Sequence, residues 1–186
     1  MKKPDDVSMP VLLVDTREQR PLAFSHLSAE SATLQTGDYS VRGLEDCFCV
    51  ERKTLADLAG SLTRDRARFM RELHRMRGYH FPYLLIIGGE MELKRQVDTG
   101  RIKLHQVEHS LLALQTRYRV HVCRVDNEEQ AARLVETWAF CAWREAMKPA
   151  GASLPFPDWA VGVLCPRYNA GVMPCRVLSD IETGKV

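Results

Sequence analysis

The sequence has no long hydrophobic run and very little net charge. None of its apolar stretches reaches the roughly 20 residues that a membrane-spanning helix needs, and residues 1–6 (MKKPDD) lack the apolar segment of a signal peptide. We therefore expect no membrane partner and a cytoplasmic location. The formal net charge is +2 over 186 residues. Any binding of a polyanion must therefore come from a local concentration of positive charge.

The sequence also has no C-x-x-C pair. Its six cysteines stand at positions 47, 49, 123, 141, 165 and 175, a spacing that argues against a zinc ribbon and against a secreted disulfide framework. We expect reduced thiols and assign no role to Cys165 or Cys175. His105 and His109 have the i, i+4 spacing of two zinc ligands, but the sequence places no third ligand beside them. A solvated helix face is the better interpretation of this pair.

Composition predicts one globular domain followed by a tail. The apolar fraction is 45% and the charged fraction is 27%, both ordinary for a folded domain of this size. From Lys148 onward, prolines and glycines interrupt every run. We therefore predict one domain over residues 1–147 and a C-terminal tail over residues 148–186, with no structure assigned to the tail.

Short apolar runs alternate with amphipathic stretches along the first 147 residues. The apolar runs predict strands at Val11–Val14, more weakly at Ala32–Thr36, and at Tyr39–Val41, Cys47–Val50, Tyr83–Ile87 and Val120–Val125. The amphipathic stretches predict helices from Thr54 to about Gly60 and over Thr63–Arg77, Leu104–Tyr118 and Asn127–Met147. Alternation of this kind is typical of an α/β protein with a mixed central sheet that helices cover on both faces.

Charged residues gather where a predicted strand ends. Glu51 and Lys53 stand two residues apart, so their side chains should leave the same face of the sheet while Arg52 leaves the other. A carboxylate there can hold Mg²⁺, and the lysine can orient or deprotonate a water beside a phosphate. Asp38, after Gly37 in a predicted turn, is the natural second carboxylate. An isolated Glu-x-Lys pair would more often be a strand-end salt bridge.

One predicted helix is strongly basic. Between Leu62 and His80 the chain has six arginines against two acids, Asp65 and Glu72. The helical period puts Phe69, Leu73 and Met76 on one side. It puts Arg64, Arg68, Arg71 and Arg75 on roughly the opposite side. We interpret the arginines as a DNA-binding face that contacts phosphates, and a solvated helix face is the alternative.

Three motifs stand in order along the first part of the chain. They are V-D-T-R-E at residues 14–18, G-D-Y at 37–39, and V-E-R-K at 50–53 followed by D-L at 57–58 and S-L at 61–62. This set resembles the XPF-type structure-specific nuclease domain. The resemblance covers Val11 to about Ile87 with specific motifs and continues more weakly to about Met147. It implies a restriction-endonuclease-like core that cuts branched or flap-containing DNA with Mg²⁺ or Mn²⁺.

The resemblance also implies roles for single residues. Asp38 and Glu51 would ligate the metal, with Asp15 as a further ligand and Glu18 as an additional acid. Lys53 would activate water, Arg52 would be an active-site arginine, and Arg17 would face phosphate or the acids.

Proteins of this type commonly carry tandem helix-hairpin-helix motifs after the nuclease domain. The stretch after Lys148 is too short and too rich in proline for them. Substrate choice is therefore left open, and so is a homodimer.

The expected function is cleavage of branched, flap or nicked DNA in repair, recombination or phage DNA processing. A non-enzymatic alternative is a DNA-binding partner subunit that keeps the fold and has lost cleavage. A second alternative keeps the nuclease and changes its nucleic-acid substrate. Retention of the acids together with Lys53 favours an active enzyme, whereas the motifs do not separate the possible substrates.

Overall fold

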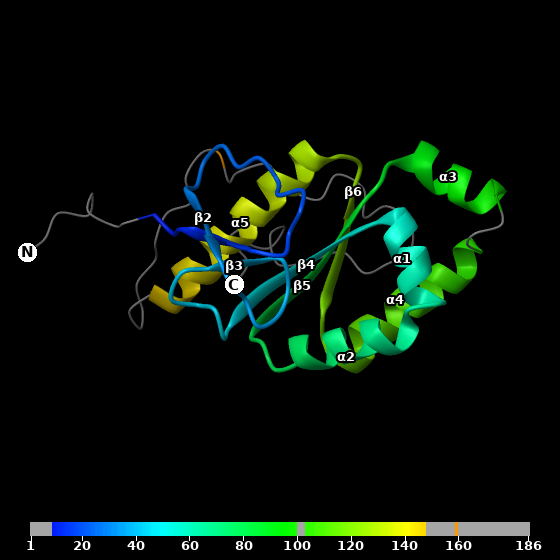
Figure 1. The fold of residues 1–186 in the computed structure, drawn as a ribbon, viewed down its shortest axis with the longest axis horizontal. Coiled ribbons are helices and arrows are strands. Elements are labelled where there is room, and N and C mark those ends of the chain that lie inside the picture. The colour runs from blue at the N-terminus through cyan, green and yellow to red at the C-terminus, as the bar shows by residue number, and fades with distance from the viewer. Residues whose placement is uncertain (1–8, 100–102, 148–158, 160–186) are drawn as a thin grey trace, which may run out of the picture.

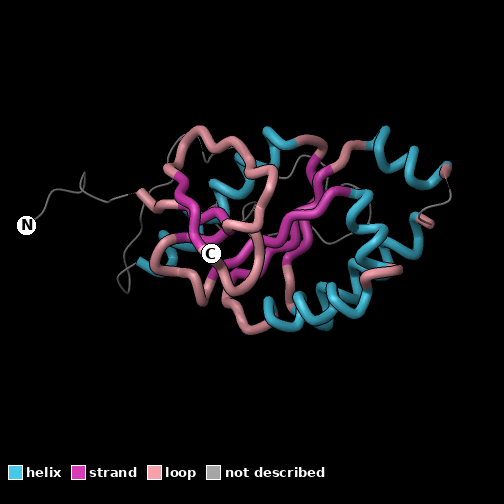
Figure 2. The backbone as a smooth tube through the Cα atoms, viewed as in Figure 1, coloured by secondary structure: helices cyan, strands magenta, loops and turns pink. Residues whose placement is uncertain are grey.

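A computed structural model describes residues 9–99, 103–147 and 159. In this part of the chain a six-stranded sheet, with strand order β2-β1-β3-β4-β5-β6, runs through the middle of the molecule (Figures 1 and 2). The strands are β1 (Leu12–Asp15), β2 (Ala29–Ala32), β3 (Tyr39–Val41), β4 (Phe48–Thr54), β5 (Phe81–Ile87) and β6 (His121–Val125). The helices are α1 (Leu55–Leu62), α2 (Arg66–Met76), α3 (Glu90–Asp98), α4 (Leu104–Tyr118) and α5 (Glu128–Met147).

The sheet is mixed, as the sequence predicted. Strands β4, β5 and β6 are parallel, β3 is antiparallel to both of its neighbours β1 and β4, and β1 is parallel to β2. Two reversals between β1 and β4 make these two strands run in the same direction. The carboxyl ends of β1 and β4 therefore meet the start of β3 at one edge of the sheet.

Helices cover both faces and divide the core in two. On one face α5 packs with a cluster that includes Phe48 and Val50 of β4, and on the other α1, α2 and α4 pack with a cluster that includes Cys49. Side chains alternate along a strand, so this division continues into the polar end of β4. Glu51 and Lys53 leave on the α2 face, and Arg52 leaves on the α5 face.

The start of α1 follows the prediction, and its end does not. Thr54 is the N-cap, as expected, because its hydroxyl accepts a hydrogen bond from Asp57 N at 3.1 Å. The sequence predicted an end or a bend at Gly60, and the end is wrong because α1 continues to Leu62. The hydroxyl of Thr63 then donates to Ala59 O at 2.7 Å and closes α1. The next helix consequently begins at Arg66 rather than at Thr63.

Two surface elements differ from the prediction. β2 occupies Ala29–Ala32 instead of Ala32–Thr36; it is an edge strand whose residues are exposed or half-buried, so it carries no alternating pattern. The helix α3 was not predicted at all, because Gln96 is its one buried residue. Arg64 precedes α2 and lies in a turn, so it is not part of the helical row of arginines that the sequence predicted.

The predicted tail, residues 148–186, lies outside the described residues apart from Trp159. The indole of Trp159 stacks on the ring of His26, with centroids 4.8 Å apart, and packs edge-on against Phe140 at 5.8 Å. No helix among the residues that the structure describes is long and apolar enough to span a membrane.

Candidate active site

The three acids that the sequence singled out start from one row across β1, β3 and β4. The backbone N–H of Asp15 donates to Asp38 O at 2.8 Å, and the N–H of Asp38 donates to Val50 O at 2.7 Å. The register of the three strands, with Val14 opposite Tyr39 and Tyr39 opposite Val50, therefore aligns Asp15, Asp38 and Glu51. Local pairing of three strands thus brings together residues that lie up to 36 positions apart in the sequence.

Gly37 provides the backbone conformation that leads into Asp38 and this row. Its φ of +81° lies in the left-handed region that favours glycine, and a Cβ there would lie 2.8 Å from Val50 O. The turn before Asp38 is thus pressed against the backbone of β4. A side chain at position 37 would displace Asp38 from its place beside Glu51.

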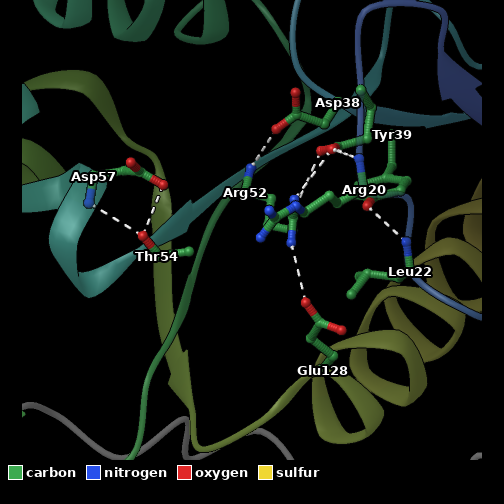
Figure 3. A network of polar contacts seen from close by, with 9 residues as sticks. Arg20, Leu22, Asp38, Tyr39, Arg52, Thr54, Asp57 and Glu128 are labelled. Atoms are coloured by element: carbon green, nitrogen blue, oxygen red, sulfur yellow. Dashed lines mark hydrogen bonds and ion pairs between the residues drawn. The ribbon is translucent and has the colours of Figure 1, made fainter. Parts of the chain in front are cut away.

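Glu51 is a buried carboxylate, and Asp38 beside it is half-buried. Asp38 Oδ2 accepts a hydrogen bond from Arg52 N at 2.7 Å (Figure 3), and Glu51 pairs with Lys53 Nζ. Burial, reinforced by the negative charge of Glu18, raises the pKa of Asp38 to about 6. Burial and the adjacent Asp38 raise the pKa of Glu51 to about 8. The raised pKa values mean that ionising these two carboxyl groups costs free energy, and a nearby cation would offset that cost.

Lys53 lies between two carboxylates over an aromatic ring. Its ammonium contacts Glu51 Oε1, lies 3.7 Å from Glu72 Oε2, and sits 5.2 Å from the ring centroid of Phe69. Burial lowers the pKa of Lys53, but Glu51 and Glu72 raise it by more, so the net shift is upward. The side chain is therefore a cation at neutral pH. A charged lysine donates hydrogen bonds, which suits orienting a water better than deprotonating one.

Glu72 was not predicted as a site residue. It lies on α2, three residues after the buried Phe69, and its negative charge contributes to the raised pKa of both Asp38 and Glu51. In the sequence Glu72 is one of two acids on a basic helix. The signal that could have identified it is its position beside Phe69, on the flank of α2 that turns toward the sheet.

Arg52 is fixed on the opposite face of β4. Its Nη2 lies 3.1 Å from Glu18 Oε1, and its Nε donates to Glu18 Oε2 at 3.3 Å. Its Nη1 lies 3.8 Å from Glu128 Oε1 of α5 (Figure 3). The same Glu18 carboxylate accepts the backbone N–H of Arg20 at 2.7 Å. Glu18 therefore joins the loop after β1 to the end of β4.

The carboxylate of Asp15 is hydrogen-bonded to Arg17. This carboxylate accepts Arg17 Nε at 2.6 Å, Arg17 Nη2 at 3.1 Å, Arg17 N at 2.9 Å and Leu34 N at 2.8 Å. Burial raises the pKa of Asp15, but these hydrogen bonds lower it by more. Both oxygens are therefore in use, and the role of Asp15 as a metal ligand stays a prediction. The side chain of Arg17 is 69% exposed, so it is open to a phosphate.

The donors present suit a hard cation that keeps its own water. Among the described residues no group of three His, Cys, Asp or Glu side chains is arranged to hold a metal ion. Asp38 and Glu51 offer carboxylate oxygens alone, which Mg²⁺ and Mn²⁺ accept while several waters complete the coordination. His105 and His109 both have exposed side chains, with ring centroids 6.4 Å apart.

The predicted arginine row is shorter than expected. Arg68, Arg71 and Arg75 are exposed on α2 and form no ion pair within the described residues, and these three are called the arginine row below. Arg64, in the preceding turn, lies 3.3 Å from Asp65 Oδ2. The row stands on the helix that also supplies Glu72, so its positive charge flanks Asp38 and Glu51.

Comparison with known proteins gives consistent results. The model of the ERCC4 domain family matches residues 14–137. XPF from Aeropyrum pernix has a similar structure, with a TM-score of 0.58 and 22% identity over 80% of this chain and 66% of that one. XPF from Aeropyrum pernix in complex with DNA gives a TM-score of 0.55 and 22% identity over 75% and 68%. The chain thus spans about two thirds of these structures. None of the curated proteins compared with it matches its sequence.

Proposed function

The chain belongs to the ERCC4 domain family, a family of structure-specific DNA nucleases, and we propose that it is a metal-dependent endonuclease that hydrolyses phosphodiesters at branched, flap or nicked DNA. The observation that carries this proposal is the placement of Asp38, Glu51 and Lys53 at one edge of the sheet. Two carboxylates with raised pKa values, Asp38 and the buried Glu51, stand beside a lysine that stays charged. This combination suits hydrolysis of a phosphate ester.

Asp38 and Glu51 would hold the cation. When bound there, Mg²⁺ or Mn²⁺ would supply charge stabilisation at the phosphate and a more acidic water. The surrounding side chains would supply the other interactions with water, phosphate and cation. Lys53, held by Glu51 and Glu72, would donate a hydrogen bond to the attacking water or to a phosphate oxygen. We retain Asp15 as a candidate further ligand, which requires Arg17 to release one of its oxygens.

The arginines around this edge have separate tasks. Arg52, through Glu18 and Glu128, fixes the end of β4 and hence the backbone N–H that binds Asp38. Arg17 and the arginine row are exposed and would bind phosphates of the DNA backbone. Arg64 would add a contact only if DNA displaces Asp65. Similarity to a structure determined with DNA supports a DNA partner.

A catalytically inactive, DNA-binding subunit is the second candidate. Nothing in the geometry favours it, because a chain that only binds DNA has no need to hold two partly desolvated carboxylates together at a cost in stability. We propose a role in DNA repair, recombination or phage DNA processing, and we keep a homodimer as a candidate assembly.

The proposal is tested by cleavage with Mg²⁺, with Mn²⁺ and with EDTA. The substrates are a fork, a flap, a nicked duplex, a Holliday junction, a linear duplex, a single strand and an RNA. Metal-dependent incision of the fork, flap or nicked substrate is the expected result. Binding without incision of any substrate would favour the inactive subunit, and incision of RNA alone would change the substrate class.

A further inference from the structure

A cationic groove lies between α2 and α4, away from Asp38 and Glu51. Its volume is about 210 Å³, and its lining includes Arg66 and Met70 of α2 and His109, Ser110 and Arg117 of α4. The hydroxyl of Tyr118 donates to Met70 Sδ at 3.7 Å, which ties the two helices together at the groove. No Asp or Glu lines it.

The two arginines of the groove are not neutralised. Neither Arg66 nor Arg117 forms an ion pair with any residue that the structure describes. The guanidinium of Arg117 lies over the ring of Tyr118, 5.5 Å from its centroid, a contact that leaves its N–H donors available. Two unpaired guanidinium groups from different helices, in a lining that also includes Ser110, suit a phosphate.

The groove stands on the flank of α2 opposite the candidate active site. Arg66 and Glu72 are six residues apart, which at 3.6 residues per turn separates their directions by about 120°. Glu72 contacts Lys53 on one flank, whereas Arg66 and Met70 face α4 on the other. A helix with its side chains is about 10–12 Å across, close to the roughly 12 Å width of the major groove of B-DNA.

We propose that the α2–α4 groove binds a backbone phosphate of duplex DNA, on the strand opposite to the one whose phosphate lies at Asp38 and Glu51. Because the diameter of a helix is close to the width of the major groove, the two flanks of α2 would face the two backbones of one duplex. A single strand would bind at the carboxylate edge and along the exposed arginines, and it has no second backbone to fill the groove. This inference rests on the proposed DNA nuclease function and adds to it a second contact that selects double-stranded arms.

The test uses the full chain in EDTA, so that binding is measured without cleavage. The double variant Arg66→Gln/Arg117→Gln removes two positive charges from the groove. Its control, Arg133→Gln/Arg144→Gln, removes two from α5 on the other face of the sheet. Affinity is measured at several salt concentrations for a duplex and for a single strand of the same sequence, and circular dichroism verifies folding.

The groove variant is expected to weaken duplex binding and to flatten the slope of log affinity against log salt by about 0.9, the change for one lost phosphate contact. Its single-strand affinity should equal that of the unmodified protein, and the control should change neither slope. An unchanged duplex slope in a folded groove variant would overturn the inference. So would an equal loss for the single strand.

The two proposals fail separately. If the unmodified protein binds duplex with the expected dependence on Arg66 and Arg117 but incises nothing, the nuclease function fails and the groove stands. If it incises DNA and the groove variant binds unchanged, the groove inference alone fails.

Discussion

Lys53 places its ammonium against the carboxylate of Glu51, two residues earlier on the same strand, and both side chains lie on the face of β4 that α2 covers. The same ammonium lies 3.7 Å from the carboxylate of Glu72 on α2. An E-x-K sequence on its own is ordinarily a surface salt bridge that contributes little. Here the pair is buried beside Asp38, and that environment makes it a candidate for catalysis.

Glu72 should act through Lys53. We expect Glu72→Gln to lower kcat by roughly 10- to 100-fold, the usual effect of losing a group that orients a site residue, with little change in KM. The control is Glu145→Gln, an exposed acid on α5. A Glu72→Gln enzyme with unchanged kcat would show that the contact with Lys53 is structural only.

Stability should depend on pH with a sign that follows from Glu51. Its pKa rises from 4.5 to about 8 on folding, so between these values the folded protein binds more protons than the unfolded chain. The free energy of unfolding should therefore fall as pH rises through this window when no divalent cation is present. Glu51→Gln should flatten the decline. Urea denaturation in EDTA at several pH values measures it.

Added Mg²⁺ should change stability over the same pH range, between 4.5 and about 8. Because a carboxylate must be deprotonated to ligate a metal, added Mg²⁺ should stabilise the protein more near the upper end of the window than near the lower end. The Glu51→Gln variant should lose most of this stabilisation. Equal stabilisation of both proteins at every pH would place the cation elsewhere.

Two glycines offer a matched pair. Gly37 and Gly43 have nearly equal φ values of +81° and +82°, but a Cβ at Gly37 would lie 2.8 Å from Val50 O, whereas nothing lies within 4 Å of one at Gly43. Gly43→Ala should therefore cost about 1 kcal/mol from backbone strain alone. Gly37→Ala should cost about 2–4 kcal/mol, since a steric clash adds to the strain. Denaturation of both variants measures the difference, and equal losses would contradict the close contact.

The arginine row should contribute binding without sequence preference. Replacing Arg68, Arg71 and Arg75 pairwise by glutamine should weaken binding to all DNA sequences alike, because phosphate contacts carry no base information. Each true contact removed should flatten the salt slope by about 0.7 to 0.9. Unmoved slopes in folded variants would show that the row is a solvated helix face. Arg64→Gln should have the smaller effect, because Asp65 already pairs with that side chain.

Strand periodicity sufficed to predict much of the site. Alternation along β4 placed Glu51 and Lys53 on one face and Arg52 on the other, and the cap at Thr54 fixed the start of α1. Local patterns of this kind depend on residues near each other in the chain. Glu72 was missed because its contact with Lys53 arises only when α2 packs against β4.

Other features depended on tertiary structure in the same way. The pairing of Asp15 with Arg17 could not be predicted from the motif, because the spacing of the two residues is equally compatible with a separate role for each in the site. The helix α3 buries little, so its pattern is weak. The edge strand β2 owes its place to pairing with β1 and not to any alternation of its own residues.

The central claim is that Asp38, Glu51 and Lys53 form one metal-dependent catalytic site. Its most direct test measures incision of a flap substrate with Mg²⁺ or Mn²⁺ by Asp38→Ala, Glu51→Ala and Lys53→Ala, with Glu45→Ala, an exposed acid, as control. Each of the three should abolish incision while DNA binding in EDTA stays within a few-fold of the unmodified protein, and the control should cut normally. Normal turnover by any of the three would remove that residue from the mechanism, and incision by all three would contradict the account.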